Sequence, residues 1–87
     1  MPYIPTENRT RLYNLLENYF RYPGAENSGE LNYILTIIIN SYFKEHGSNY
    51  AAINDVVGAL EGAKVEFQRR AVAPYEDKKI KENGDIT

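Results

Sequence analysis

Apolar residues recur at spacings of three and four along most of the chain, which is the period of an amphipathic helix. The first such stretch contains Leu12, Leu15, Leu16, Tyr19 and Phe20. Thr6 suits the start of this helix as a capping residue, and the pair Pro23 and Gly24 ends the pattern. The spacing predicts a first helix over residues 6–21, followed by a polar loop.

A second apolar stretch follows the loop and is the most apolar part of the chain. One face is formed by Leu31, Ile34, Leu35, Ile38 and Tyr42, and Ile37, Ile39 and Phe43 widen it. β-branched runs favour strands, but this segment is long and shows no alternation of period two. Lys44, His46 and Gly47 are typical of a helix C-terminus. We therefore predict a second helix over 29–46, with Ser28 as its cap.

The third stretch is the longest and predicts a helix over 49–73. Its stripe keeps 3-4 spacing through Tyr50, Ile53, Val57, Leu60, Lys64, Phe67 and Ala71. Gly58 and Gly62 lie inside it, and each costs about 1 kcal/mol relative to Ala. Two explanations stay open: a small-residue groove that admits another helix, or weak points tolerated in a helix held by packing.

Pro74 either kinks the third helix or starts a short fourth helix over 74–83. Asn83 and Gly84 form a good stop signal. The pattern thus predicts an all-α protein, a three- to four-helix unit with a long third helix. We expect a single helical domain over residues 1–87.

The lengths of these segments predict self-association. A compact globule of 87 residues has a radius of gyration of about 12 Å, whereas a continuous helix over 49–73 is about 37 Å long. The second helix is apolar on more than one face and needs cover on more than one side. We expect a homodimer or higher closed oligomer. The alternative is a compact monomer with a bent third helix. The expected interface residues are Leu35, Ile38, Ile39, Tyr42, Val57 and Leu60.

Composition removes several classes of protein. The chain is 43% hydrophobic and 25% charged and has no cysteine, which excludes a wholly disordered or disulfide-stapled chain. Ten Lys and Arg against 12 Asp and Glu give a net charge of −2, so nucleic acid is an unlikely partner. The most apolar run has only six residues, 34–39, and a membrane span needs about 20. We expect no membrane partner and a cytoplasmic location.

A search for catalytic chemistry finds no candidate. The chain has no cysteine and one histidine, His46, which suits the negative end of its helix better than a triad. Metal-ligand spacings, phosphate-binding loops and a nucleophile elbow are all missing from the sequence. We expect a non-enzymatic protein with no catalytic residue, no metal site and no cofactor.

Signals for binding are stronger. Eight tyrosines are spread along the chain, and tyrosine suits half-buried interfaces and base stacking. Arg69 and Arg70 precede Tyr75, and Lys78 and Lys79 follow it. Such a cluster can hold an anionic ligand with an aromatic ring, with Tyr75 or Tyr3 stacking on the ring. The alternative is a solvated surface whose cations are neutralised by Glu66, Glu76, Asp77 and Glu82.

Four stretches carry a family resemblance: Met1–Ile4, Gly29–Tyr33, Ile53–Val56 and, most specifically, Val72–Ile86, which reads VAPYEDKKIKENGDI. The chain resembles a family of small uncharacterised proteins found in bacteriophages, prophages and bacteria, which carries a domain-of-unknown-function label. The resemblance extends over nearly the whole chain and implies no mechanism. It does imply a phage-type accessory protein that acts stoichiometrically on host defences, in the cytoplasm of the host cell.

Three functions remain open. The leading hypothesis is sequestration of a nucleotide-like immune signal, such as a cyclic nucleotide, in pockets between subunits. The alternative is an adaptor or inhibitor that docks on a host protein through an apolar face or the segment after Pro74. The third is a weak nucleic-acid-binding regulator that pairs two Arg69–Arg70 patches. None of the three needs a catalytic residue.

Overall fold

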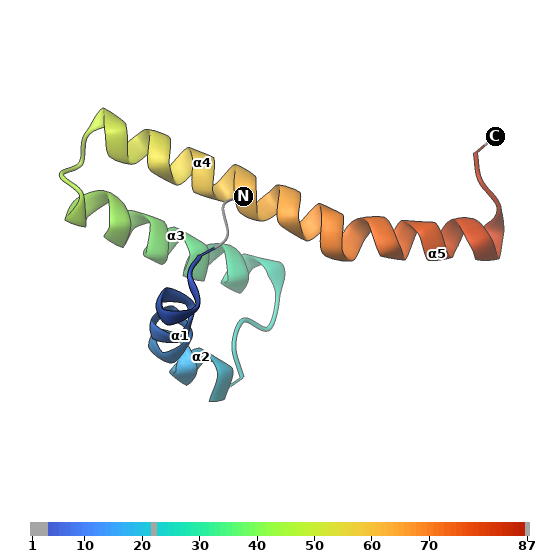
Figure 1. Ribbon diagram of the computed structural model, residues 1–87, viewed down its shortest axis with the longest axis horizontal. Helices are drawn as coiled ribbons and strands as arrows, with labels where there is room; N and C mark the ends of the chain where they lie inside the picture. Colours follow the sequence, from blue (N-terminus) through green and yellow to red (C-terminus); the bar gives the residue numbers. More distant parts are fainter. Residues whose placement is uncertain (1–3, 22, 87) are drawn as a thin grey trace. The chain divides into compact units, whose positions relative to one another are not determined.

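Helices account for all the regular structure that the computed structural model describes, which comprises residues 4–21 and 23–86. The predicted all-α class is confirmed, since no strand occurs in these residues. The elements are α1 (Thr6–Leu15), α2 (Glu17–Arg21), α3 (Ser28–Glu45), α4 (Tyr50–Phe67), the π-helical segment η1 (Gln68–Val72) and α5 (Ala73–Asn83) (Figure 1).

The elements fall into two units along the chain. One unit holds α1, α2 and α3, and the other holds α4, η1 and α5. Each is described by itself below. That the two units together form one domain over residues 1–87 stays a prediction.

The segment predicted as one helix over 6–21 is divided in two. Leu16 separates α1 from α2, with φ −93° and ψ 4°, and its N–H lies 3.3 Å from the Leu12 carbonyl and 3.1 Å from that of Tyr13. A residue in this conformation no longer continues the α-helical ladder. Neither glycine nor proline marks the position, so the apolar spacing runs through it without a signal.

Helix α3 begins one residue before the predicted start and uses a different cap. Asn27 is in an extended conformation, and its side-chain oxygen accepts a hydrogen bond from the Glu30 N–H at 2.9 Å. The Glu30 carboxylate in turn accepts from the Glu26 N–H at 3.0 Å. This reciprocal arrangement satisfies backbone donors that the helix leaves unpaired, and Ser28, the predicted cap, becomes the first helical residue.

Helix α3 ends at a turn with two residues of positive φ. Gly47 has φ 96° and Ser48 has φ 50°, and the Asn49 side chain donates to the His46 carbonyl at 3.2 Å. Glycine is the residue that adopts positive φ at least cost, which explains the stop at this point. The backbone of Ser48 therefore belongs to the turn that precedes α4.

The helix continues through Pro74 without a break. Helix α4, η1 and α5 contain 18, 5 and 11 residues and follow one another without a gap from Tyr50 to Asn83. The yellow-to-red ribbon of Figure 1 shows this continuous helix. In η1 the Ala73 N–H donates to the Gln68 carbonyl, five residues earlier. Proline lacks an N–H and its ring crowds the carbonyl four residues before it, so a wider turn just ahead of Pro74 accommodates it.

Side-chain burial is sparse in both units. Among the described residues only Ala52, at 1% exposure, is buried, whereas Val57 is 60% exposed and Phe67 is 64% exposed. Several large apolar residues of α3 are similarly exposed, including Ile38 at 52%. The helices therefore keep much of their apolar surface uncovered within each unit.

The two glycines Gly58 and Gly84 predict stability changes of opposite sign. A Cβ on Gly58 would meet no atom within 4 Å, so Gly58→Ala should stabilise the protein by about 1 kcal/mol through helix propensity. Gly84 has φ 87° and ψ 157°, a region open essentially to glycine, so Gly84→Ala should destabilise by about 1–3 kcal/mol.

Thermal and urea unfolding followed by circular dichroism will measure both changes. A loss of stability or of assembly in Gly58→Ala would show that another helix approaches Gly58 closely. That outcome would select the groove explanation over the tolerated weak point.

Candidate functional site

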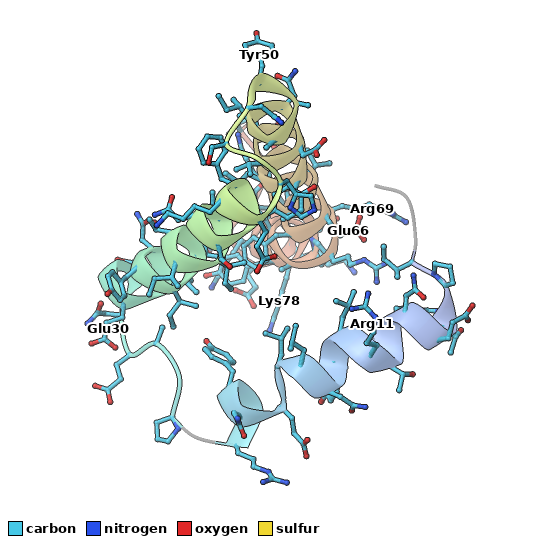
Figure 2. The ribbon with its side chains drawn as sticks, turned by 90° about the vertical axis from the view of Figure 1, so that its left-hand side faces the viewer. Arg11, Glu30, Tyr50, Glu66, Arg69 and Lys78 are labelled. Carbon is cyan, nitrogen blue, oxygen red and sulfur yellow. The ribbon has the colours of Figure 1, made fainter. Side chains whose placement is uncertain are left out.

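The candidate ligand residues lie on one helix but not on one face of it. Arg69 and Arg70 belong to η1, and Tyr75, Lys78 and Lys79 belong to α5. Successive α-helical residues diverge by about 100° around the axis, so the two neighbouring lysines point in different directions. Figure 2 looks along the long helix and shows Lys78 projecting from a different side than Arg69 and Glu66.

Tyr75 and Lys79 are the part of the cluster that comes together. The Lys79 ammonium lies 5.5 Å from the centroid of the Tyr75 ring, within the range of a cation–π contact. The same ammonium is 3.3 Å from a carboxylate oxygen of Glu82. Tyr75 remains 61% exposed, so one aromatic face flanked by a cation is open to solvent.

Lys78 belongs to a different surface. It lines a shallow hollow of about 400 Å³ together with Pro74, Asp77 and Lys81. Lys79 instead lines a hollow of about 450 Å³ around the C-terminal end of α5. The two lysines therefore line separate hollows.

Arg70 is engaged with a carboxylate one turn before it. Its guanidinium forms an ion pair and hydrogen bond with Glu66, which has i,i+4 spacing along the helix. This hydrogen bond, with the nearby charges of Arg70 and Arg69, lowers the pKa of Glu66 from its ordinary 4.5. The pairing of Arg70 with Glu66 matches the alternative in which acidic neighbours neutralise the cations.

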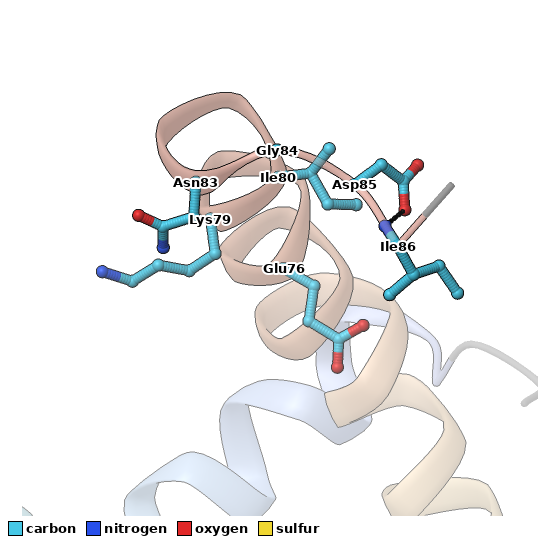
Figure 3. Close-up of a pocket in the computed structure, with 7 residues that line it drawn as sticks. All are labelled: Glu76, Lys79, Ile80, Asn83, Gly84, Asp85 and Ile86. Carbon is cyan, nitrogen blue, oxygen red and sulfur yellow. Dashed lines mark hydrogen bonds between the residues drawn. The ribbon is translucent and has the colours of Figure 1, made fainter.

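The hollow at the end of α5 is formed by the most specific motif of the sequence. Glu76, Lys79 and Asn83 project from the helix, and Ile80 lies between them and the last residues described (Figure 3). The Gly84 N–H closes the helix by donating to the Ile80 carbonyl at 2.8 Å. Beyond Gly84 the Ile86 N–H donates to the Asp85 carboxylate at 2.6 Å, and the Ile86 side chain is 98% exposed.

The expected interface residues retain surface that a partner could cover. On α3, Leu35, Ile38 and Tyr42 are 43%, 52% and 36% exposed, and Ile39 is half-buried. On α4, Val57 is 60% and Leu60 43% exposed. Tyr3, the remaining predicted ligand residue, lies outside the described residues.

Sequence reasoning missed one ordered contact at the end of α3. The rings of Tyr42 and His46 stack with centroids 3.9 Å apart, and His46 Nδ1 lies 2.9 Å from the Tyr42 carbonyl oxygen. The i,i+4 spacing of an aromatic residue and a histidine was the available signal. The contact places His46 at the C-cap of α3, which is the end of the helix where its imidazole was expected.

Two searches of the described residues complete the account of possible sites. In the part of the chain that the structure describes, no three His, Cys, Asp or Glu side chains gather closely enough to hold a metal ion. None of the described helices combines the length and apolar character that crossing a membrane requires.

An all-helical chain with uncovered apolar stripes and scattered surface cations defines an architectural class but no reaction. Residues 1–86 match the family described as "Domain of unknown function (DUF6899)", and the chain belongs to that family. No curated protein and no solved structure shows significant similarity to it.

The Glu66–Arg70 pair predicts a pH-dependent contribution to stability. Because the pKa of Glu66 is lowered in the folded state, the contribution is complete above pH 4.5 and disappears as the pH falls through the folded pKa. Glu66→Gln should therefore lower the melting temperature slightly at pH 7 and have no effect in strong acid.

Circular dichroism melts of the unmodified protein and of the Glu66→Gln variant at several pH values will test this expectation. Glu82→Gln is a suitable control, since Glu82 pairs with Lys79 on another turn. Equal destabilisation by Glu66→Gln at all pH values would contradict it.

Proposed function

We propose that this chain is a non-enzymatic helical protein that assembles with copies of itself and acts by stoichiometric binding. The supporting observation is the apolar surface that each of the two units leaves uncovered. Val57, Phe67 and Ile38 all exceed 50% exposure in helices whose stripes predict burial. Burying such side chains contributes about 1.5–3 kcal/mol each, which gives association a strong driving force.

We expect the purified protein to have a mass in solution of at least twice 10.0 kDa. Light scattering coupled to size-exclusion chromatography will measure it over a wide range of concentrations. Its melting temperature should rise with concentration, because association stabilises the folded state by mass action. A mass of 10.0 kDa at all concentrations would contradict the proposal.

The proposed role of the assembly is sequestration of a nucleotide-like signal by a phage-type accessory protein. The specific observation in favour is Tyr75, whose exposed ring is flanked by the Lys79 ammonium. An aromatic face beside a cation suits a base that carries a phosphate. Since Lys78 and Lys79 lie on different surfaces of one chain, such a ligand would use Arg69 or Lys78 of a neighbouring copy.

Cyclic di- and trinucleotides should raise the melting temperature of the native protein by several degrees. Tyr75→Ala should remove most of that shift, whereas Lys44→Ala in α3 should leave it unchanged. Thermal melts with a panel of nucleotides will measure both. The absence of a shift with every nucleotide would count against sequestration and leave self-association intact.

A protein partner is the second candidate, favoured by the exposed Ile86 and by the apolar Ile80 in the hollow beside it. The adaptor proposal expects capture of one host protein in stoichiometric amount. Changing Lys78→Ala and Lys79→Ala together should not affect that capture, whereas Ile86→Asp should abolish it.

A further inference from the structure

The C-terminal end of α5 holds the one asparagine of the sequence that is followed by glycine. The pair is Asn83 and Gly84, whereas every other asparagine precedes a residue that carries a side chain. Asparagine is thermolabile because the backbone nitrogen of the next residue can attack its side-chain carbonyl carbon. Glycine places no side chain beside that nitrogen and gives the backbone the freedom that the attack requires. The sequence therefore makes this reaction easiest at Asn83.

The side chain of Asn83 is accessible and unrestrained. Asn83 and Gly84 are both exposed, and Figure 3 shows the Asn83 carboxamide projecting outward from the last turn of α5. This carboxamide has no hydrogen-bond partner among the residues that the structure describes. Asn27 differs, because its side-chain oxygen accepts a hydrogen bond from the Glu30 N–H at 2.9 Å. Capping therefore holds the Asn27 carboxamide in place, and nothing comparable holds that of Asn83.

The attacking nitrogen is restrained by one hydrogen bond at a helix end. The Gly84 N–H donates to the Ile80 carbonyl at 2.8 Å, which closes the last turn of α5. Asn83 is the final helical residue, and Gly84 leaves the helix with φ 87° and ψ 157°. Hydrogen bonds at a helix end open at a free-energy cost close to zero. The Gly84 nitrogen is therefore released often while the rest of the helix stays folded.

We infer that Asn83 is a site of spontaneous deamidation in the folded protein. The Gly84 nitrogen forms a bond to Cγ of Asn83, and the side-chain amide leaves as ammonia with the proton of the Gly84 N–H. Water then opens the five-membered succinimide ring at either carbonyl and gives aspartate or isoaspartate. The reaction consumes one water, releases one ammonia and needs no oxidant, reductant or enzyme. This inference goes beyond the proposed function and holds whether or not the chain self-associates.

Both products weaken the end of α5. Each carries a new negative charge at the helix C-terminus, which is the negative end of the helix dipole, between Glu82 and Asp85. Isoaspartate also adds a methylene group to the main chain. That extra length moves the Gly84 N–H out of register with the Ile80 carbonyl, so the closing hydrogen bond of α5 is lost. Deamidation therefore unwinds the last turn.

The new charge also reaches the exposed Tyr75 ring. Asn83 follows Lys79 by four residues and lines the same hollow. The Lys79 ammonium lies 5.5 Å from the Tyr75 ring centroid and 3.3 Å from a Glu82 carboxylate oxygen. A carboxylate at position 83 competes for this ammonium. Modification therefore changes the electrostatic surroundings of the ring as well as the helix end.

Ageing of the full chain in mildly alkaline buffer tests the inference. Peptide mapping by mass spectrometry locates each deamidated residue in native protein and in urea-unfolded protein. We expect Asn83 to be modified before any other asparagine. Its rate in urea should exceed its native rate by less than about fivefold, because the helix end opens readily.

A matched variant separates the structural argument from the dipeptide alone. Ser28→Gly gives Asn27 a following glycine, but Asn27 is held in its capping hydrogen bond. Breaking the cap costs free energy, so the rate at Asn27 in urea should exceed its native rate by more than about tenfold. Native protection of Asn83 equal to or greater than that of Asn27 would overturn the inference. Modification of another asparagine first would overturn it as well.

Circular dichroism of the separated products measures the effect on α5. Deamidated protein carries an extra negative charge and separates by ion exchange. It should show less helix than fresh protein, and freshly prepared Asn83→Asp should reproduce the part of the loss that is due to charge. Asn83→Gln should keep its helix content through ageing, since the larger ring that glutamine would form closes far more slowly. Unchanged helix content in the deamidated protein would overturn the unwinding of the last turn and leave Asn83 as the site of modification.

Discussion

Burial of apolar surface is the constraint on which the other features depend. Helices α3 and α4 carry apolar residues of the kind that form a core, yet Ala52 is the single buried residue in the part of the chain that the structure describes. Hydrophobic burial is the main force that opposes conformational entropy. The few apolar contacts within each unit therefore leave little burial to offset that entropy.

The passage of the helix through Pro74 shows how a local backbone problem is solved without ending the helix. Proline removes one donor and crowds the turn before it, and the five residues of η1 widen that turn. The arrangement distributes the cations of the motif around the axis. Arg70 pairs with Glu66, and Lys79 pairs with Tyr75 and Glu82, so the charges are largely organised within the helix itself.

Sequence periodicity predicted the helical class and the approximate extents of α3 and α4, because 3-4 spacing depends only on helix geometry. It missed the break at Leu16, where no glycine or proline stands, and the π-helical turn, which depends on how the chain relaxes around Pro74. The cluster around Tyr75 was predicted from proximity along the sequence. Residues that are neighbours in the sequence point to different sides of a helix, so Lys78 and Lys79 line separate hollows.

The wide turn of η1 has a dynamic consequence for the long helix. Hydrogen bonds of the i→i+5 type pack the backbone less tightly, and Pro74 contributes no amide to the ladder. Amide protons of Gln68–Val72 should therefore exchange with solvent sooner than those in the middle of α4. The long helix would then bend at η1, so that α5 can change its direction relative to α4.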